Sequence, residues 1–306
     1  MYTTIVVPYD GSRHSACALP VAAALAKRTG ARIAVVIVHD PSAYIPFVPG
    51  EVAIPVYDQE LVQLHRDRDA AALADAVADL RAKGVTAEGF VLDGTVVEAL
   101  EEYVASHGTD LVVMTTHGRS GFERFRLGSM AAAFLTRSTV PVLLVRGSGS
   151  ELQGEEPPLP SGQLLCTLDG SSFAEAVLPH ARRFAEVTGM TMHLVAITVP
   201  HAISMAPFGT EALLADDSAL SAEEHVREDY LHRIAEHCPP GTTVRAITDM
   251  SVARGILDAA AESTCGAIAM ATHGRGGLKR LVLGSVADEV IRHAETPVLV
   301  FRPPQS

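Results

Sequence analysis

The chain has 306 residues, which at about 150 residues per domain is enough for two domains. It carries 24 Lys and Arg against 36 Asp and Glu, a formal net charge of −12, and so lacks the basic excess that holds a nucleic-acid backbone. Apolar residues make up 48% and charged residues 20%, which predicts a globular protein with a sizeable core and excludes a disordered chain.

The sequence predicts a cytoplasmic protein without a membrane span. The longest stretch free of Asp, Glu, Lys and Arg, 187–210, is interrupted by Pro200 and Pro207 and is typical of a strand followed by a loop. The first ten residues lack the basic and apolar regions of a signal peptide. The cysteines form no CxxC pair, which indicates reduced thiols: Cys17, Cys166, Cys238 and Cys265.

Strands and helices are predicted to alternate along the first half of the chain. Short runs rich in β-branched residues predict strands over Thr4–Val7, Ile33–Val38, Phe90–Leu92, Leu111–Met114 and Val142–Val145. Helices are predicted near Ser15–Arg28, Gln59–Lys83, Val96–His107 and Ser129–Arg137, three of them followed by the glycines Gly30, Gly84 and Gly108. Two Pro-containing stretches, 41–58 and 200–220, are predicted to be irregular loops that border a cleft.

The second half repeats the first. Thr116-His-Gly-Arg119 corresponds to Thr272-His-Gly-Arg275, and Leu127-Gly-Ser129 corresponds to Leu283-Gly-Ser285. A repeat of nearly half the chain indicates two copies of a whole domain. The sequence therefore predicts an α/β fold with two tandem, doubly wound, parallel five-stranded sheets: domain 1 over 1–146, a Gly-, Ser- and Pro-rich linker over 147–162, and domain 2 over 163–306.

Ligands of such sheets bind outside the carboxyl ends of the strands, where the winding direction changes. The first predicted strand of each half ends in Asp-Gly-Ser, with the acids Asp10 and Asp169. A carboxylate there can accept hydrogen bonds from a ligand amino group. It can equally serve as part of the cap of the following helix, and the turn alone leaves both interpretations open.

A glycine-containing loop follows the fourth predicted strand of each half. Gly118 and Gly128, and likewise Gly274 and Gly284, let backbone amides approach an anion closely. A serine then stands at a helix N-terminus, where free N–H groups and the helix dipole favour phosphate. The loops also concentrate basic residues, including Arg119 and Arg275. The alternative, two Gly-capped turns with solvated basic residues, is weakened because the spacing recurs in both halves.

Asp-Gly-Ser after the first strand, followed by the glycine loop and its terminal Ser, resembles the universal stress protein family in both halves. The resemblance implies ATP as ligand, with Mg²⁺ or Mn²⁺ accompanying it, pairing of the two halves through their last strands as a pseudo-dimer, and a possible homodimer. The candidate nucleotide-binding residues are Asp10, Val38, Thr115, Gly118, Arg119, Gly128 and Ser129 in the first half, and Asp169, Ile197, Ala271, Gly274, Arg275, Gly284 and Ser285 in the second. Thr115 and Ala271 stand where the family has the first glycine of its loop, and Ile197 stands where it has a valine.

Two classes of function remain. The first is an ATP-binding stress-response or signalling module with at most slow ATP hydrolysis, because the sequence supplies neither an identifiable base nor a metal ligand near the phosphates. The second is an interaction scaffold whose nucleotide pockets are vestigial. The chain has no GxxxxGK[ST] loop and no GxSxG nucleophile elbow, and no catalytic residue is assigned. His225, His232 and His237 are expected on a solvated helical face and are not assigned as metal ligands.

Overall fold

A computed structural model describes residues 1–40, 59–116, 127–146, 159–200, 217–272 and 283–304. Contacts divide the chain into two compact units, Met1–Pro157 (unit 1) and Pro158–Ser306 (unit 2). The predicted loop 41–58 and most of the predicted loop 200–220 lie outside the described residues. So do four candidate site residues: Gly118, Arg119, Gly274 and Arg275.

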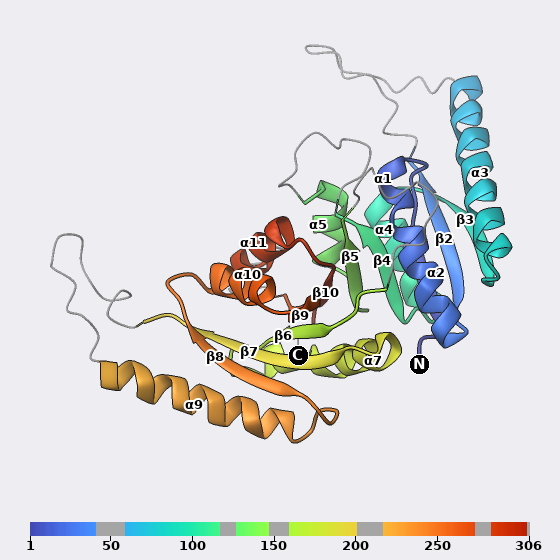
Figure 1. The fold of residues 1–306 in the computed structure, drawn as a ribbon. Helices are drawn as coiled ribbons and strands as arrows, with labels where there is room; N and C mark the ends of the chain where they lie inside the picture. The colour runs from blue at the N-terminus through green and yellow to red at the C-terminus, as the bar shows by residue number, and fades with distance from the viewer. Residues whose placement is uncertain (41–58, 117–126, 147–158, 201–216, 273–282, 305–306) are drawn as a thin grey trace, which may run out of the picture. The chain divides into compact units, whose positions relative to one another are not determined.

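Unit 1 is a parallel sheet in the order β3-β2-β1-β4-β5 (Figure 1). Its strands are β1 (Thr4–Pro8), β2 (Arg32–His39), β3 (Ala87–Asp93), β4 (Leu111–Thr115) and β5 (Val142–Val145). Its helices are α1 (Arg13–Ala16), α2 (Ala18–Thr29), α3 (Gln59–Ala82), α4 (Val96–Ser106) and α5 (Ser129–Leu135). Helix α2 packs on α3, and α4 packs on α5, as expected when the two pairs cover opposite faces of a doubly wound sheet.

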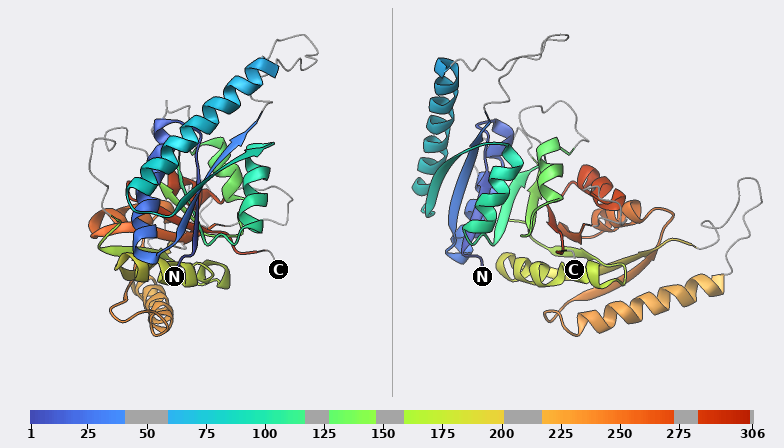
Figure 2. Two further views of the ribbon diagram at one scale, coloured as in Figure 1. Left: turned by 90° about the vertical axis from the view of Figure 1, so that its right-hand side faces the viewer. Right: turned by 180° about the vertical axis from the view of Figure 1, so that it is seen from behind.

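Unit 2 repeats this arrangement with a parallel sheet in the order β10-β9-β6-β7-β8 (Figure 1), and Figure 2 gives two further views of the ribbon. Its strands are β6 (Gln163–Thr167), β7 (Thr191–Thr198), β8 (Thr243–Thr248), β9 (Cys265–Ala271) and β10 (Val298–Phe301). Its helices are α6 (Ser172–Glu175), α7 (Leu178–Thr188), α9 (Asp217–Ala235), α10 (Val252–Glu262) and α11 (Ser285–His293). The predicted fold class, tandem doubly wound parallel sheets, is confirmed. The pairing of the halves and a homodimer stay predictions.

The central strands are buried on both faces, which explains their unbroken apolar sequences. Ile5, Val6 and Val7 of β1 are 0% exposed, and Leu164 and Leu165 of β6 are likewise 0% exposed. The three glycines predicted to end helices all have left-handed backbones, with φ of 73° at Gly30, 78° at Gly84 and 61° at Gly108.

Two predicted elements differ from the structure. The single helix predicted near Ser15–Arg28 is two helices that meet at Cys17, where the backbone N–H bonds to the His14 carbonyl. Pro20 lacks the N–H that would continue the ladder to the carbonyl four residues earlier, which accounts for the interruption. The predicted irregular stretch 200–220 is too long, because α9 begins at Asp217.

The backbone at the start of unit 2 passes very close to the backbone that leads into β9. Gly162 has φ of 90°, and a Cβ atom there would lie 2.3 Å from the Thr264 carbonyl oxygen. A Cβ atom on Gly266 would lie 2.0 Å from the Ser161 carbonyl oxygen. Both positions therefore require glycine. The Gly162 carbonyl also accepts a hydrogen bond from the Thr191 N–H at 3.1 Å, next to the first residue pair of β6 and β7.

Candidate functional site

A cavity of about 290 Å³ lies in unit 2 at the carboxyl ends of β6, β7 and β9, where the winding direction of the sheet changes. Most of its wall is apolar, and its polar groups come from the turn after β6 and from the start of α11. Its lining residues are Thr167, Leu168, Asp169, Ala174, Val195, Ile197, Val252, Ile256, Met270, Ala271, Gly284, Ser285, Val286 and Ala287. The cavity thus brings together five sequence-predicted residues: Asp169, Ile197, Ala271, Gly284 and Ser285.

Asp169 is held by the turn that opens α6. Its Oδ1 accepts hydrogen bonds from the Ser171 N–H at 2.9 Å and from the Ser171 hydroxyl at 2.5 Å. The Ser171 hydroxyl oxygen in turn accepts from the Ala174 N–H at 3.1 Å and caps α6. The acid is therefore part of a helix-capping turn and also lines the cavity, so the two interpretations of this motif are compatible.

Helix α9 fixes the same turn from outside. Arg227 Nη1 donates to the Asp169 carbonyl oxygen at 2.8 Å. One turn later in α9, the Tyr230 hydroxyl donates to Glu175 Oε1 at 3.0 Å. Burial, followed by this hydrogen bond to Glu175, raises the pKa of Tyr230, so the hydroxyl keeps the proton that it donates. These two contacts join α9 to the start of the segment, at Asp169, and to its end, at Glu175, which is the last residue of α6.

The N-terminus of α11 faces the cavity with its first turn. Gly284 is the N-cap and makes no side-chain capping bond, so the amides that follow it depend on another acceptor. Ser285 is exposed at the first helical position. The helix dipole favours an anion there. Asp288 also lies in the first turn, where its negative charge repels an anion. This repulsion is reduced because Asp288 Oδ2 accepts a hydrogen bond from Arg292 Nε at 2.8 Å.

Gly284 and Gly128 have the same ordinary backbone conformation. Their φ values are −55° and −57°, with ψ of 148° and 143°, so neither requires glycine for its backbone. What glycine offers at these positions is the absent side chain. A bulky residue at Gly128 would therefore require no forbidden backbone angles, and its effect on a ligand would come only from filling the space in front of the helix.

The five described candidates of unit 1 occupy the matching places in its own sheet. Asp10 Oδ1 accepts from the Ser12 N–H at 2.9 Å and from the Ser15 hydroxyl at 2.5 Å. Val38 is half-buried near the end of β2, and Thr115 is 8% exposed at the end of β4. The remaining two, Gly128 and Ser129, are the N-cap and first residue of α5.

Sequence reasoning missed the apolar part of the unit 2 cavity. Val252 and Ile256 lie one turn apart on α10 and form one side of the cavity, while Met270 of β9 contributes to another side. The alternation of strands and helices could have identified them, because the helix after the third strand covers the same face as the last helix. Helix α10 does pack on α11.

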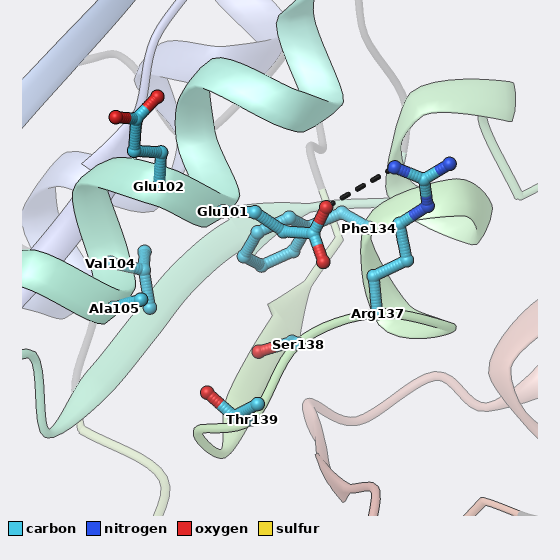
Figure 3. Close-up of a pocket in the computed structure, with 8 residues that line it drawn as sticks. All are labelled: Glu101, Glu102, Val104, Ala105, Phe134, Arg137, Ser138 and Thr139. Atoms are coloured by element: carbon cyan, nitrogen blue, oxygen red, sulfur yellow. Dashed lines mark hydrogen bonds and ion pairs between the residues drawn. The ribbon is translucent and has the colours of Figure 1, made fainter.

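A second cavity, of about 240 Å³, lies between α4 and α5 in unit 1 (Figure 3). Phe134 of α5 contributes to its apolar lining, and Arg137 bonds to Glu101 Oε2 across it at 3.2 Å. None of its lining residues is a sequence-predicted site residue, and no motif marks it.

No helix in the described part of the chain is long and apolar enough to cross a membrane. Within the same residues, no group of three His, Cys, Asp or Glu side chains is placed to hold a metal ion. His225 and His232 lie on α9 as predicted, and His237 follows the end of that helix.

The fold and the cavity place the chain among α/β proteins built from two tandem, doubly wound units. The family model described as the universal stress protein family matches residues 1–146 and 161–302. The chain belongs to the universal stress protein family.

Sequence relatives agree with this assignment, and a solved structure shares the fold. A universal stress protein of Mycolicibacterium smegmatis is 29% identical over 209 residues, 65% of this chain and 64% of that protein. The chain thus spans slightly under two thirds of that relative. One from Thermus aquaticus is 33% identical over 147 residues, 48% of this chain and 100% of that protein. The crystal structure of a universal stress protein from Archaeoglobus fulgidus, 20% identical, covers 98% of each chain with a TM-score of 0.68.

Proposed function

We propose that unit 2 binds ATP in its cavity, and that the chain acts as a nucleotide-dependent stress-response or signalling module with at most slow hydrolysis. The observation that carries the proposal is the meeting, around one cavity, of an apolar wall, a strand-end carboxylate and the N-terminus of α11. These three surfaces match a nucleobase face, a base amino group and a phosphate.

The size of the cavity supports a base and sugar inside it. Its volume of about 290 Å³ is near the lower end of the ~300–1,000 Å³ typical of small-molecule sites. A triphosphate would therefore extend out of the cavity past Gly284 and Ser285, where the helix amides and dipole favour it. A divalent cation bound with ATP would take most of its ligands from phosphate and water, as Mg²⁺ usually does.

Binding of ATP is expected to be measurable directly. The purified full chain, stripped of nucleotide, should release or absorb heat on titration with ATP and Mg²⁺, and its unfolding temperature should rise with ATP concentration. A matched titration with inorganic triphosphate separates recognition of the base from attraction of phosphate. If millimolar ATP gives neither binding heat nor a thermal shift, the chain is better described as a scaffold with vestigial pockets.

Ser285→Ala is expected to weaken ATP binding only modestly. The hydroxyl supplies one hydrogen bond among several backbone amides that remain, so the loss should be about 1 kcal/mol, or roughly fivefold in Kd. Calorimetry on this variant and on Ser129→Ala would compare the two units. A loss of binding beyond about a hundredfold would mean that the serine has a larger role than one hydrogen bond.

A further inference from the structure

The apolar wall of the unit 2 cavity depends on a close contact between β7 and α10. Ile197, the second-last residue of β7, lines the cavity, and Gly255 is buried in α10 between the lining residues Val252 and Ile256. A Cβ atom at Gly255 would lie 3.1 Å from Ile197 Cδ1 and 3.1 Å from Ile197 Cγ2. Because Gly255 has no side chain, the Ile197 side chain can pack directly against α10.

The third neighbour of that missing Cβ atom is held in place. Asp249 Cβ would also lie 3.1 Å away. Asp249 Oδ1 accepts from the Ser251 N–H at 2.8 Å, and the Asp249 N–H donates to the Thr198 carbonyl oxygen at 3.1 Å. Because Asp249 is tied at both its side chain and its backbone, a side chain at position 255 would displace Ile197 toward the cavity.

Unit 1 has different side chains at the positions that correspond to Ile197 and Gly255. Its second-last residue of β2 is Val38, smaller than Ile197 by one methyl group. Four residues after the helix N-cap, unit 1 has Ala99 where unit 2 has Gly255. Counted from the same N-cap, Asp93 corresponds to Asp249, but the N–H that donates to the carbonyl of the last β2 residue, His39, belongs to Gly94, at 3.2 Å. Unit 1 thus has a smaller residue at the strand position and a larger residue at the helix position.

We propose that Ile197 and Gly255 form a matched pair that sets the width of the base pocket in unit 2. Gly255 is a positioning residue, which acts on the ligand through Ile197. The pair places the isoleucine against one face of a planar purine base, and the Val38–Ala99 combination gives unit 1 a differently shaped wall. The inference rests on the proposed nucleotide binding.

The test uses the full chain carrying Gly128→Val, so that unit 2 is observed alone, with ATP and Mg²⁺ as the probe. Gly255→Ala should weaken ATP binding about tenfold, because overpacking moves Ile197 into the pocket. Ile197→Val removes one methyl group from the wall of the pocket and should weaken ATP binding about threefold, which supplies the second single variant of the mutant cycle. The double variant Ile197→Val, Gly255→Ala reproduces the unit 1 combination and should recover most of the lost affinity.

Thermal unfolding without nucleotide provides a second readout of the same pair. The shifts in melting temperature of the two single variants should not add in the double variant, because the side chains share one space. Unchanged ATP affinity in Gly255→Ala, or a double variant as weak as that single variant, would overturn the inference. Additive melting shifts would overturn the packing contact itself. If the background protein binds no ATP while the melting shifts are non-additive, the nucleotide proposal fails and the pair is only structural.

Discussion

Replacing Gly284 with valine is expected to abolish ATP binding by unit 2 while leaving its fold intact. Valine adopts the observed φ of −55° and ψ of 148° without strain, so the backbone can keep its course. Its side chain would stand in front of the first turn of α11 and keep a phosphate from the helix amides. The valine N-cap should cost about 1 kcal/mol of unfolding free energy relative to glycine.

Calorimetric stoichiometry separates the two units in this experiment. Gly284→Val should remove the unit 2 site, Gly128→Val tests unit 1 in the same way, and the double variant should bind no ATP. Gly284→Ala is a graded control, since a single methyl group blocks less of the space in front of the helix. Full ATP binding by Gly284→Val would show that phosphate does not approach α11.

Asp169→Asn is expected to remove the preference of unit 2 for adenine over hypoxanthine. The amide keeps an oxygen for the Ser171 N–H and hydroxyl, so the turn is preserved, but its NH₂ group cannot accept from the base amino group. Loss of one hydrogen bond to a charged acceptor amounts to about 1.5–3 kcal/mol, or roughly ten- to hundredfold in ATP affinity.

Inosine triphosphate provides the matched ligand, because its base carries a carbonyl in place of the amino group. In the Gly128→Val background, the chain with Asp169 should bind ATP more tightly than ITP, and Asp169→Asn should lose this preference, because its NH₂ group can donate to the hypoxanthine carbonyl but cannot accept from the adenine amino group. Asparagine is a more selective substitution than alanine, because alanine would also remove the oxygen that accepts both hydrogen bonds from Ser171. An ATP preference that survives Asp169→Asn would mean that another group recognises the base.

Local sequence signals predicted the elements of unit 1 to within a few residues, because apolar strands and glycine-ended helices are local features. The Val142–Val145 strand has the predicted bounds, and Gln59–Ala82 ends one residue before the predicted helix. The break at Cys17 was missed because apolar periodicity continues through it. It depends on Pro20, a single missing N–H.

The residues of the candidate site also fall into two groups: those that local sequence signals predict and those that depend on packing. Asp169, Ile197 and Ser285 stand at strand ends or helix starts, and parallel strands bring such positions together at one edge of the sheet. The contributions of α10 could not be found by motif, since Val252 and Ile256 are ordinary apolar residues of an amphipathic helix. Gly255 has meaning only beside Ile197, a neighbour that lies 58 positions away in sequence and is identified by packing alone.

The paired glycines at the start of unit 2 have a practical consequence for dissecting the chain. Gly162 and Gly266 let two stretches of backbone lie almost in contact, with the Ser161 and Thr264 carbonyl oxygens in the places of side chains. The residues just before β6 therefore pack against the sheet of unit 2, and a flexible linker sequence cannot replace them without losing this contact. A fragment meant to carry unit 2 alone should begin at Pro158, where the unit itself begins, because truncation at Gln163 would remove Ser161 and Gly162 from their contact with Thr264 and Gly266.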